Sequence, residues 1–381
     1  MNEKKKILLL IDWFAPGYKA GGPIQSCVNI SLMLKKDYDM YVLTTDTDHG
    51  EKKPYEGIPA NKWITNLDPD VHVYYAKKSA LNLKQLKSQI LDANAEIVYL
   101  NHLFSPKFVL YPLWLKYTRR LKSKVVVSPR GALYESALAV KPLKKKPFLW
   151  LFKFLRIYSL VTFHATNERE KEAILHYFPG SDVVVADNLP NTNQPAFVGC
   201  EKNEGTVKCI FIARIVPIKN LLFLLNVIRN IKDKVELTII GPVEDESYWN
   251  ECKKMIAENQ SNIKVNYEGP KRNDELISFI RKNHLFILPT TGENFGHSIF
   301  ESLLAGRPVL ISDQTPWLNL AEKKAGWELP LDHPGKFKEV IERVAAFDQA
   351  AFDVWAQGAW QYAKSFIENS ELHQKYLELF S

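Results

Sequence analysis

Two glutamates, Glu293 and Glu301, stand eight positions apart around a glycine-containing loop that opens a helix. The apolar run 285–289 before them is short and ends in proline, which predicts a buried strand. Apolar residues recur at helical spacing over 297–305, a glycine then supplies a stop, and a second strand is predicted over 308–312. The stretch is therefore predicted to fold as strand, loop, helix and strand.

The start of such a helix carries unpaired backbone N–H groups and the positive end of the helix dipole. Backbone amides of Asn294, Phe295 and Gly296 can therefore donate to an anionic or polyhydroxylated ligand, and the glycine permits close approach. Glu293 precedes the helix and Glu301 lies more than one turn inside it, so their carboxylates would be separate acceptors for different hydroxyls. The spacing alone leaves open the alternative that Glu301 is a solvated helix residue.

Two cations precede this stretch in the sequence. An apolar strand that starts near Val207 ends at Arg214, and Lys219 stands just before a helix predicted to begin near Asn220. Two fixed cations beside a helix start form a pyrophosphate site, where each charge-assisted hydrogen bond contributes about 1.5–3 kcal/mol. They would also stabilise charge on a departing nucleoside diphosphate. The alternative is that Arg214 pairs with a neighbouring acid and Lys219 is solvated.

These residues resemble the E-x7-E element and the phosphate clamp of retaining GT-B glycosyltransferases of the glycosyltransferase 4, or group 1, family. The resemblance extends through the loop glycine, the run 302–310 and the triplet 315–317. It implies that Glu293 contacts the donor sugar and that Glu301 contacts the ribose of the nucleotide. It also implies that the backbone amides of 294–296 hold the sugar and the phosphates.

Two glycines precede a helix predicted over 24–34, after a strand predicted over 6–12. Gly21 and Gly22 allow close backbone approach by a phosphate or sugar, although the G-x-G-x-x-G fingerprint of dinucleotide sites is absent. A tight turn without a ligand is the alternative. Resemblance to the family implies that these glycines line the cleft opposite the donor phosphates.

His102 and Arg130 each follow a predicted strand, where parallel sheets place ligand-contacting residues. A structural histidine is the alternative for the first, and a cation that ties its loop to the fold is the alternative for the second. The family commonly has a histidine after this strand, and Arg130 is expected to contact the acceptor or the donor sugar. The predicted catalytic residues are thus Glu293, His102, Arg214 and Lys219, and the predicted donor-binding residues are Gly21, Gly22, Arg130, Asn294, Phe295, Gly296 and Glu301.

Composition and patterning indicate a two-domain α/β protein. The 381 residues, 46% hydrophobic and 24% charged, exceed what one core usually supports, and strands alternate with helices through both halves. A break in 188–206 predicts domains over 1–190 and 206–360, followed by a C-terminal helix over 361–381. The resemblance implies a GT-B fold, two Rossmann-like domains with parallel sheets facing a cleft. It also implies that the last helix packs on the first domain, the alternative being a terminal helix of the second.

Part of the net charge of +7 lies in segment 141–158, which mixes lysines with Phe148, Trp150, Phe152 and Phe154. Such a segment can lie on an anionic membrane surface; a core helix edged by lysines is the alternative. No run reaches the roughly 18 apolar residues of a transmembrane helix, and the start of the chain lacks a signal-peptide core. A cytoplasmic protein is expected, at the inner membrane face if this segment binds lipid.

Two D-x-D patterns, 46–48 and 68–70, match the metal-binding pattern of other glycosyltransferases. Both are expected in outer loops of the first domain, where such pairs are common in turns. The four cysteines are scattered without metal-ligand spacing, which is typical of reduced thiols. No metal and no cofactor are therefore predicted, and the absence of helix-turn-helix, zinc or RNP signals argues against nucleic acid.

The function that the resemblance implies is retaining, metal-independent transfer of a sugar, of the hexosyltransferase type, from a nucleotide-diphosphate sugar. The acceptor would be a hydroxyl of a glycan or lipid-linked molecule in surface polysaccharide or glycolipid assembly. Two alternatives stay open: a GT-B-like sugar-nucleotide epimerase, which uses no acceptor, and an inactive nucleotide-sugar-binding scaffold. The intact set of Arg214, Lys219, Glu293 and Glu301 argues against the scaffold.

Overall fold

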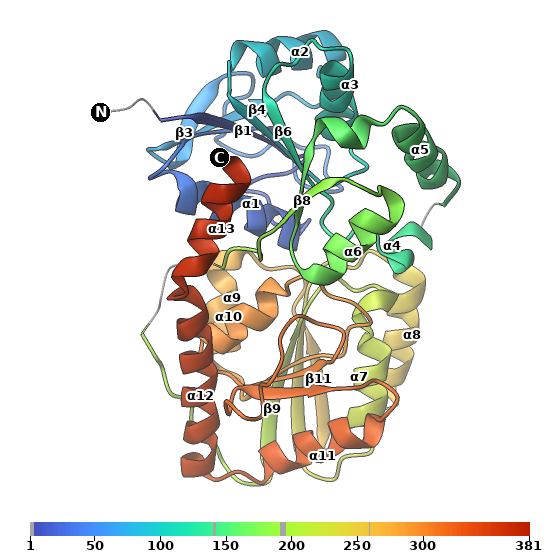
Figure 1. The fold of residues 1–381 in the computed structure, drawn as a ribbon. Helices are drawn as coiled ribbons and strands as arrows, with labels where there is room; N and C mark the ends of the chain where they lie inside the picture. Colours follow the sequence, from blue (N-terminus) through green and yellow to red (C-terminus); the bar gives the residue numbers. More distant parts are fainter. Residues whose placement is uncertain (1–3, 140–141, 191–195, 259) are drawn as a thin grey trace. The chain divides into compact units, whose positions relative to one another are not determined.

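The computed structural model describes residues 4–139, 142–190, 196–258 and 260–381, and the chain divides into two compact units (Figure 1). Unit 1 comprises Met1–Pro190 and Ser370–Ser381, and unit 2 comprises Asn191–Asn369. Part of the expected break, 191–195, lies outside the described residues, as does the start of the basic segment at 140–141. Unit 1 is therefore assembled from two separate stretches of sequence.

Unit 1 is built on a sheet with the strand order β3-β4-β2-β1-β5-β6-β7-β8, in which only the β3–β4 pair is antiparallel among the described residues. The strands are β1 (Lys6–Leu10), β2 (Asp39–Thr45), β3 (Trp63–Asp68), β4 (Val71–Ala76), β5 (Ile97–Asn101), β6 (Lys124–Ser128), β7 (Thr162–Ala165) and β8 (Asp182–Val185). The helices are α1 (Gly22–Leu34), α2 (Leu83–Asp92), α3 (Tyr111–Tyr117), α4 (Glu135–Ala139), α5 (Pro142–Phe154), α6 (Glu168–Tyr177) and α13 (Ser370–Phe380), with short turns η1 (Pro106–Leu110) and η2 (Ile157–Leu160).

Unit 2 is built on an entirely parallel sheet, within the described residues, in the order β11-β10-β9-β12-β13-β14. Its strands are β9 (Thr206–Ile212), β10 (Lys234–Ile240), β11 (Ile263–Tyr267), β12 (Leu285–Leu288), β13 (Val309–Ser312) and β14 (Gly326–Leu329). Its helices are α7 (Leu221–Ile228), α8 (Glu246–Ala257), α9 (Asn273–Ile280), α10 (His297–Leu304), α11 (Pro334–Ala345) and α12 (Gln349–Ile367), and η3 (Pro217–Lys219) is a short 3-10 turn. The two sheets confirm the predicted α/β class.

Burial explains why the central strands read as continuous apolar runs. Every residue of β12 and β13 is buried, as are four of the five residues of β1. Parallel strands are covered by helices on both faces, so side chains of both orientations lose contact with water. Alternation of apolar and polar residues is consequently lost, and the strands are recognised by length and by the glycines and prolines that end them.

Each sheet has one switch point, at which the chain has finished adding strands on one side and begins to add them on the other. In unit 1, successive strands run outward from β1 through β2 on one side and from β5 to β8 on the other. In unit 2, β10 and β11 lie on one side of β9, while β12 to β14 lie on the other. Loops that leave the carboxyl ends of the two strands at such a point diverge, and in open α/β sheets ligands bind in the opening between them.

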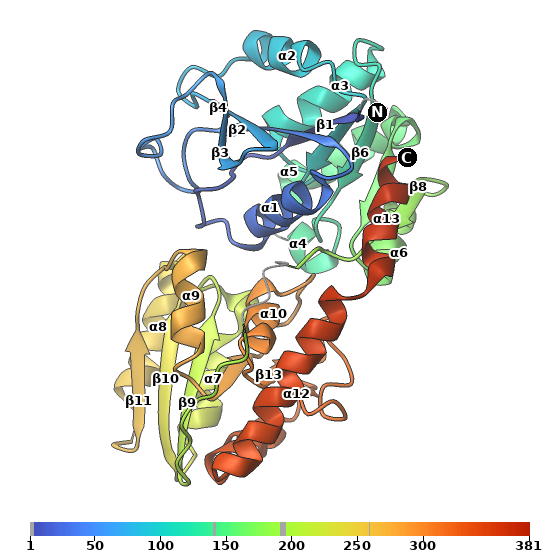
Figure 2. The ribbon, with the colours of Figure 1, turned by 90° about the vertical axis from the view of Figure 1, so that its left-hand side faces the viewer.

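Two helices end the described chain. Helix α12 belongs to unit 2, where it lies beside α10 (Figure 2). Its Trp355 stacks on Trp327 with a ring separation of 4.0 Å. Helix α13 belongs to unit 1, in which Tyr376 and Phe380 are fully buried. The expected boundary between 360 and 361 falls inside α12, because the apolar face of that helix continues as far as Ile367. None of the described helices has the length and apolar character needed to cross a membrane.

Candidate functional site

The predicted residues of unit 2 follow two strands that are direct neighbours at its switch point. Arg214 and Lys219 come after β9, and Glu293 comes after β12. Strands β9 and β12 pair in parallel, so their carboxyl ends lie at the same edge of the sheet. Lys219 and Glu293, 74 positions apart in the chain, are thereby brought to one place, as the order β10-β9-β12-β13 requires.

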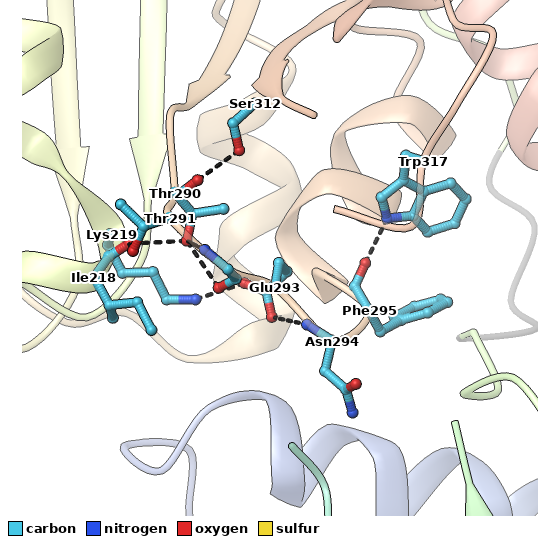
Figure 3. A network of polar contacts seen from close by, with 10 residues as sticks. Ile218, Lys219, Thr290, Thr291, Glu293, Asn294, Phe295, Ser312 and Trp317 are labelled. Atoms are coloured by element: carbon cyan, nitrogen blue, oxygen red, sulfur yellow. Dashed lines mark hydrogen bonds and ion pairs between the residues drawn. The ribbon is translucent and has the colours of Figure 1, made fainter. Parts of the chain in front are cut away.

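Lys219 and Glu293 form an ion pair at this edge. The ammonium nitrogen of Lys219 lies 2.5 Å from Oε2 of Glu293, and the two side chains are only 13% and 19% exposed. The other carboxylate oxygen, Oε1, accepts a hydrogen bond of 3.1 Å from the backbone N–H of Asn294 (Figure 3). Both oxygens of Glu293 therefore have donors, and the carboxylate is fixed in orientation.

The charge state of Glu293 follows from these contacts. Burial by itself raises the pKa of a carboxyl group, but the Lys219 charge and hydrogen bond outweigh it, with help from Asn294 N–H and the charge of Arg214. The pKa of Glu293 is consequently lowered from its ordinary value. Glu293 is thus an ionised acceptor, which suits orientation of sugar hydroxyls and not donation of a proton.

A network of small polar residues, which sequence reasoning missed, fixes the turn that carries Lys219. The carbonyl oxygen of Ile218 accepts hydrogen bonds from the N–H of Thr291 at 2.9 Å and from the hydroxyls of Thr290 and Thr291 at 2.9 and 3.3 Å (Figure 3). The hydroxyl of Ser312 donates to the Thr290 carbonyl at 2.5 Å. The only available signal was the presence of hydroxyl residues directly after two predicted strands.

The amino-terminal end of α10 presents backbone donors next to the ion pair. Gly296 is its N-cap, with a left-handed φ of 79°, and the N–H groups of Phe295 and Gly296 have no partner among the described residues. A Cβ at Gly296 would lie 2.6 Å from Ile299 Cδ1 and 3.1 Å from Glu293 Cγ. Glycine is therefore required for two reasons, the backbone angle and the space beside Glu293. The indole N–H of Trp317 donates to the Phe295 carbonyl and holds this loop in place.

Glu301 lies one turn inside α10 and is half-buried. Across the described part of the chain, no hydrogen bond or ion pair reaches its carboxylate. Desolvation raises the pKa of Glu301 from 4.5 to about 8. The two glutamates therefore have opposite environments. Glu293 is ionised and paired with a cation, whereas Glu301 has no partner among the described residues and a pKa near neutral pH.

Arg214 points to a different acid. Its guanidinium lies 2.8 Å from Oε2 of Glu244, in the loop after β10, and its side chain is 40% exposed. Arg214 thus pairs with a neighbouring acid, as one half of the alternative stated. The other half, a solvated Lys219, does not hold, because Lys219 pairs with Glu293. The structure therefore brings Lys219 and Glu293 into contact and leaves Arg214 near enough to act on Glu293 through its charge alone.

The predicted glycines of unit 1 lie at the start of α1, in the loop after β1. Gly21 is the N-cap, with φ 67° and ψ −127°, a conformation open essentially to glycine, and Gly22 begins the helix. Asp48 braces the preceding turn by accepting hydrogen bonds from the N–H groups of Tyr18 and Lys19 at 2.9 and 3.2 Å. A Cβ at Gly21 would meet no atom within 4 Å, so this glycine is required by its backbone angles alone.

His102 and Arg130 occupy left-handed backbone positions after β5 and β6, with φ values of 71° and 55°. The His102 ring is exposed, and its Nδ1 accepts a hydrogen bond from the backbone N–H of Phe104 at 3.4 Å. Arg130 instead donates to Asn101 and Tyr99 at 3.0 Å each, and to Asn188. These contacts correspond to the alternative in which Arg130 ties its loop to the fold of unit 1.

The first of the two D-x-D patterns does not lie as expected, whereas the second, 68–70, falls at the turn between β3 and β4. Asp46 and Asp48 are buried, not in an outer loop, and Asp46 accepts a hydrogen bond from the N–H of Lys78 at 2.9 Å. Asp68 forms an ion pair with Lys35 at 2.6 Å. Short polar side chains at these turns satisfy backbone donors, which explains the pattern without a metal. Within the described residues, no group of histidine, cysteine and acidic side chains is arranged to hold a metal ion.

Residues 196–344 match the family model described as Glycosyl transferases group 1. Among solved structures, the chain is similar to Anabaena Alr3699/HepE in complex with UDP and glucose, with 16% identity, a TM-score of 0.70 and 98% of each chain covered. It is similar to sucrose-phosphate synthase from Thermosynechococcus elongatus, with 14% identity, a TM-score of 0.72 and 99% of each chain covered.

A third similar structure is WaaG, described as a glycosyltransferase involved in lipopolysaccharide biosynthesis, with 12% identity, a TM-score of 0.66 and 98% of each chain covered. No curated protein sequence matches the chain. The structural neighbours are GT-B glycosyltransferases, and their coverage includes both units. The family match falls within the unit that pairs Lys219 with Glu293. Residues 196–344 thus match the group 1 glycosyl transferases, and the chain as a whole has the GT-B fold.

Proposed function

We propose that this protein is a retaining, metal-independent glycosyltransferase of the hexosyltransferase type, which uses a nucleotide-diphosphate sugar and transfers its sugar to an acceptor hydroxyl. The observation that carries the proposal is the Lys219–Glu293 pair beside the backbone N–H groups of Phe295 and Gly296, which have no partner among the described residues. One cation, one fixed carboxylate and free backbone donors at a sheet switch point match the needs of a diphosphate joined to a sugar. UDP and glucose bound to the similar Anabaena protein support a donor of this class.

In the proposed reaction, the bond between the anomeric carbon and the diphosphate oxygen breaks first, through an oxocarbenium-like transition state. The negative charge that develops on the leaving oxygen is stabilised by Lys219 and Arg214, so the stabilisation is greatest in the transition state. The acceptor oxygen forms its bond on the same face, and its proton passes to the leaving phosphate oxygen. Glu293 orients the sugar through its hydroxyls, consistent with its lowered pKa.

Metal independence is supported by the charges already present. Lys219 and Arg214 can together balance much of the charge that a divalent ion would balance on a leaving diphosphate. Unit 1 would bind the acceptor, and the Gly21–Gly22 turn and His102, which lie at its own switch point, would approach the donor sugar. The lipopolysaccharide role of WaaG supports a glycan or lipid-linked acceptor, in surface polysaccharide or glycolipid assembly.

The decisive experiment follows a labelled nucleotide sugar in the presence of chelator. Uridine and guanosine diphosphate sugars are first screened by thermal shift, and a stabilising donor is then incubated with and without a panel of glycan and lipid-linked acceptors. Transfer with the anomeric configuration kept, as read by NMR, is the expected result. An isomerised donor without acceptor would indicate the epimerase, and donor binding without any turnover would indicate the scaffold. If transfer occurred without chelator and were lost when chelator was added, metal independence would be refuted.

A further inference from the structure

Helix α5 carries an apolar stripe that faces solvent. Leu143, Pro147, Trp150, Leu151 and Phe154 recur at the spacing of one helical face, and all five are exposed. The exposed fraction is 90% for Leu143, 65% for Trp150 and 68% for Phe154. The rings of Trp150 and Phe154 stack with a separation of 5.2 Å and an interplanar angle of 9°. Figure 1 shows α5 at the rim of unit 1.

The opposite face of α5 already holds the helix to unit 1. Leu149 and Phe152 are buried there, and the Phe148 ring packs edge-on against Phe104 at 5.6 Å. Lys145 also turns inward, donating to the Ala137 carbonyl at 2.7 Å. The outward stripe is therefore a second apolar surface that the fold of unit 1 does not use. Of the four aromatics noted in the sequence, Phe148 and Phe152 serve the fold, whereas Trp150 and Phe154 do not.

The charged residues of α5 itself are all positive. Lys144, Lys146 and Lys153 are exposed on α5, next to the apolar residues. Between Glu135 and Glu168 the sequence has six lysine or arginine residues and no aspartate or glutamate. An apolar stripe edged only by cations complements a surface that is hydrophobic below and anionic above, which is the interface of a bilayer containing acidic lipids.

We propose that α5 docks flat on an anionic lipid surface, with Trp150 and Phe154 in the headgroup zone and Lys144, Lys146 and Lys153 against lipid phosphates. Aromatic side chains favour the headgroup zone of a bilayer. The apolar stems of lysines can also lie there while their charged ends remain in water. A second copy of the chain is a poorer occupant. A symmetric contact through this face would bring the same cations together on both sides.

The test is co-sedimentation of the full chain with vesicles of phosphatidylcholine alone or mixed with a quarter phosphatidylglycerol. Binding to the mixed vesicles and its weakening by salt are expected. Each lysine near an anionic surface contributes about a fivefold factor in partition, so Lys144→Glu/Lys146→Glu should lower binding by at least roughly thirtyfold. Lys145 is left in place because it holds the helix.

Two further variants separate this surface from general charge and from folding. Trp150→Gln/Phe154→Gln should lower binding to the mixed vesicles at least tenfold with an unchanged melting temperature, because both rings are exposed. Lys253→Glu/Lys254→Glu, two exposed lysines of α8, changes the net charge equally and should leave binding within twofold of wild type.

The proposal would be overturned if the wild type did not bind the mixed vesicles, or if the α8 variant lost as much binding as the α5 variants. It would equally be overturned if the wild type did not bind vesicles but formed a dimer that only the aromatic variant abolished. Nucleic-acid binding that is lost with the lysines while vesicle binding persists would also contradict it. The assay contains no sugar nucleotide, so its failure would leave the proposed transferase activity unaffected, and the reverse also holds.

Discussion

Lys219 Nζ and Glu293 Oε2 lie 2.5 Å apart although 74 residues separate them in the chain. The contact exists because β9 and β12 are adjacent in the sheet, and the Thr290–Ile218 hydrogen bond ties the two following loops together. Each group is held in place by the other before any ligand arrives. A bound diphosphate would share Lys219 with Glu293, so the cation is already positioned at low cost in side-chain freedom.

Removing either member of this pair should abolish most turnover. We expect Lys219→Ala and Glu293→Ala each to lower kcat/KM by about 100-fold or more, the range seen when one transition-state donor is lost. The double variant should cost little more than either single one, because the two groups act together. Lys338→Ala breaks a half-buried 3.5 Å pair with Glu342 in α11 and is the control. Wild-type turnover in either site variant would refute the assignment.

Arg214 and Glu244 provide a test of function against structure. Arg214→Ala should lower kcat by roughly ten- to hundredfold, because one of two cations near the leaving group is removed. Glu244→Gln releases the guanidinium from its 2.8 Å pair, so the KM for the donor should stay the same or fall. Steady-state kinetics decide the matter. Equal losses in the two variants would mean that Arg214 serves only to pair with Glu244.

Glu301 predicts a specific dependence on pH. Its pKa is raised by burial from 4.5 to about 8, so between these values the folded state binds more protons than the unfolded state. The free energy of unfolding should therefore decrease as pH rises from about 4.5 to about 8, and Glu301→Gln should remove this part of the slope. Urea unfolding of both proteins at several pH values measures it. Parallel profiles for the two proteins would contradict the raised pKa.

The same group should make nucleotide binding depend on pH. Ribose hydroxyls donate to the ionised carboxylate, so the affinity for UDP or GDP should increase with pH, by up to about tenfold per unit below pH 8. Calorimetry at pH 6.5, 7.5 and 8.5 would show the trend in wild type. In Glu301→Gln the affinity should be weaker and flat, and a slope that persists there would assign the effect to another group.

Gly296 should tolerate no side chain. Alanine at φ 79° is strained by about 1–3 kcal/mol, and its Cβ would press on Ile299 and on Glu293. Gly296→Ala is expected to lower both the melting temperature and kcat/KM. Gly335→Ala in the first turn of α11 is a matched control, since its Cβ would meet no atom within 4 Å. Full activity in Gly296→Ala would show that the α10 N-terminus does not contact the donor.

Thr290 is expected to act by positioning Lys219. Thr290→Val keeps the shape of the buried side chain but removes the hydroxyl that lies 2.9 Å from the Ile218 carbonyl. We expect kcat/KM to fall about tenfold, near the worth of one such hydrogen bond, with Thr290→Ser restoring most of it. If the variant only lowered the melting temperature, with kinetics unchanged, Thr290 would have a purely structural role.

The sequence was a reliable guide to local structure around the site. The helix predicted over 297–305 is α10, and the strands predicted over 285–289 and 308–312 are β12 and β13. Proline and glycine at the ends of these elements act on neighbouring residues, so short-range reasoning finds the boundaries. Pairing partners are different: that Arg214 meets Glu244, and that Lys219 meets Glu293, depends on strand order, which local periodicity does not encode.

Side-chain environments likewise depended on the tertiary structure. Glu293 and Glu301 look alike in the sequence, yet their pKa values shift in opposite directions, because only the first is near a cation. Asp46 and Asp48 looked like loop residues and are buried. In α5, the sequence could not separate Phe152, which faces the core, from Phe154, which faces water. Which side of an element is covered is decided by neighbours that are distant in the chain.

Helix α13 imposes an order on how the polypeptide can mature. It completes unit 1 by burying Phe380 against Tyr99 and Tyr38 and by inserting Tyr376, whose hydroxyl donates to the Asp187 carbonyl. During translation, the first 190 residues leave the ribosome long before Ser370–Ser381 is made. Until all of unit 2 has been synthesised, the amino-terminal unit therefore exposes the apolar surface that α13 will cover. A nascent chain stalled before α13 would present this surface to chaperones and proteases.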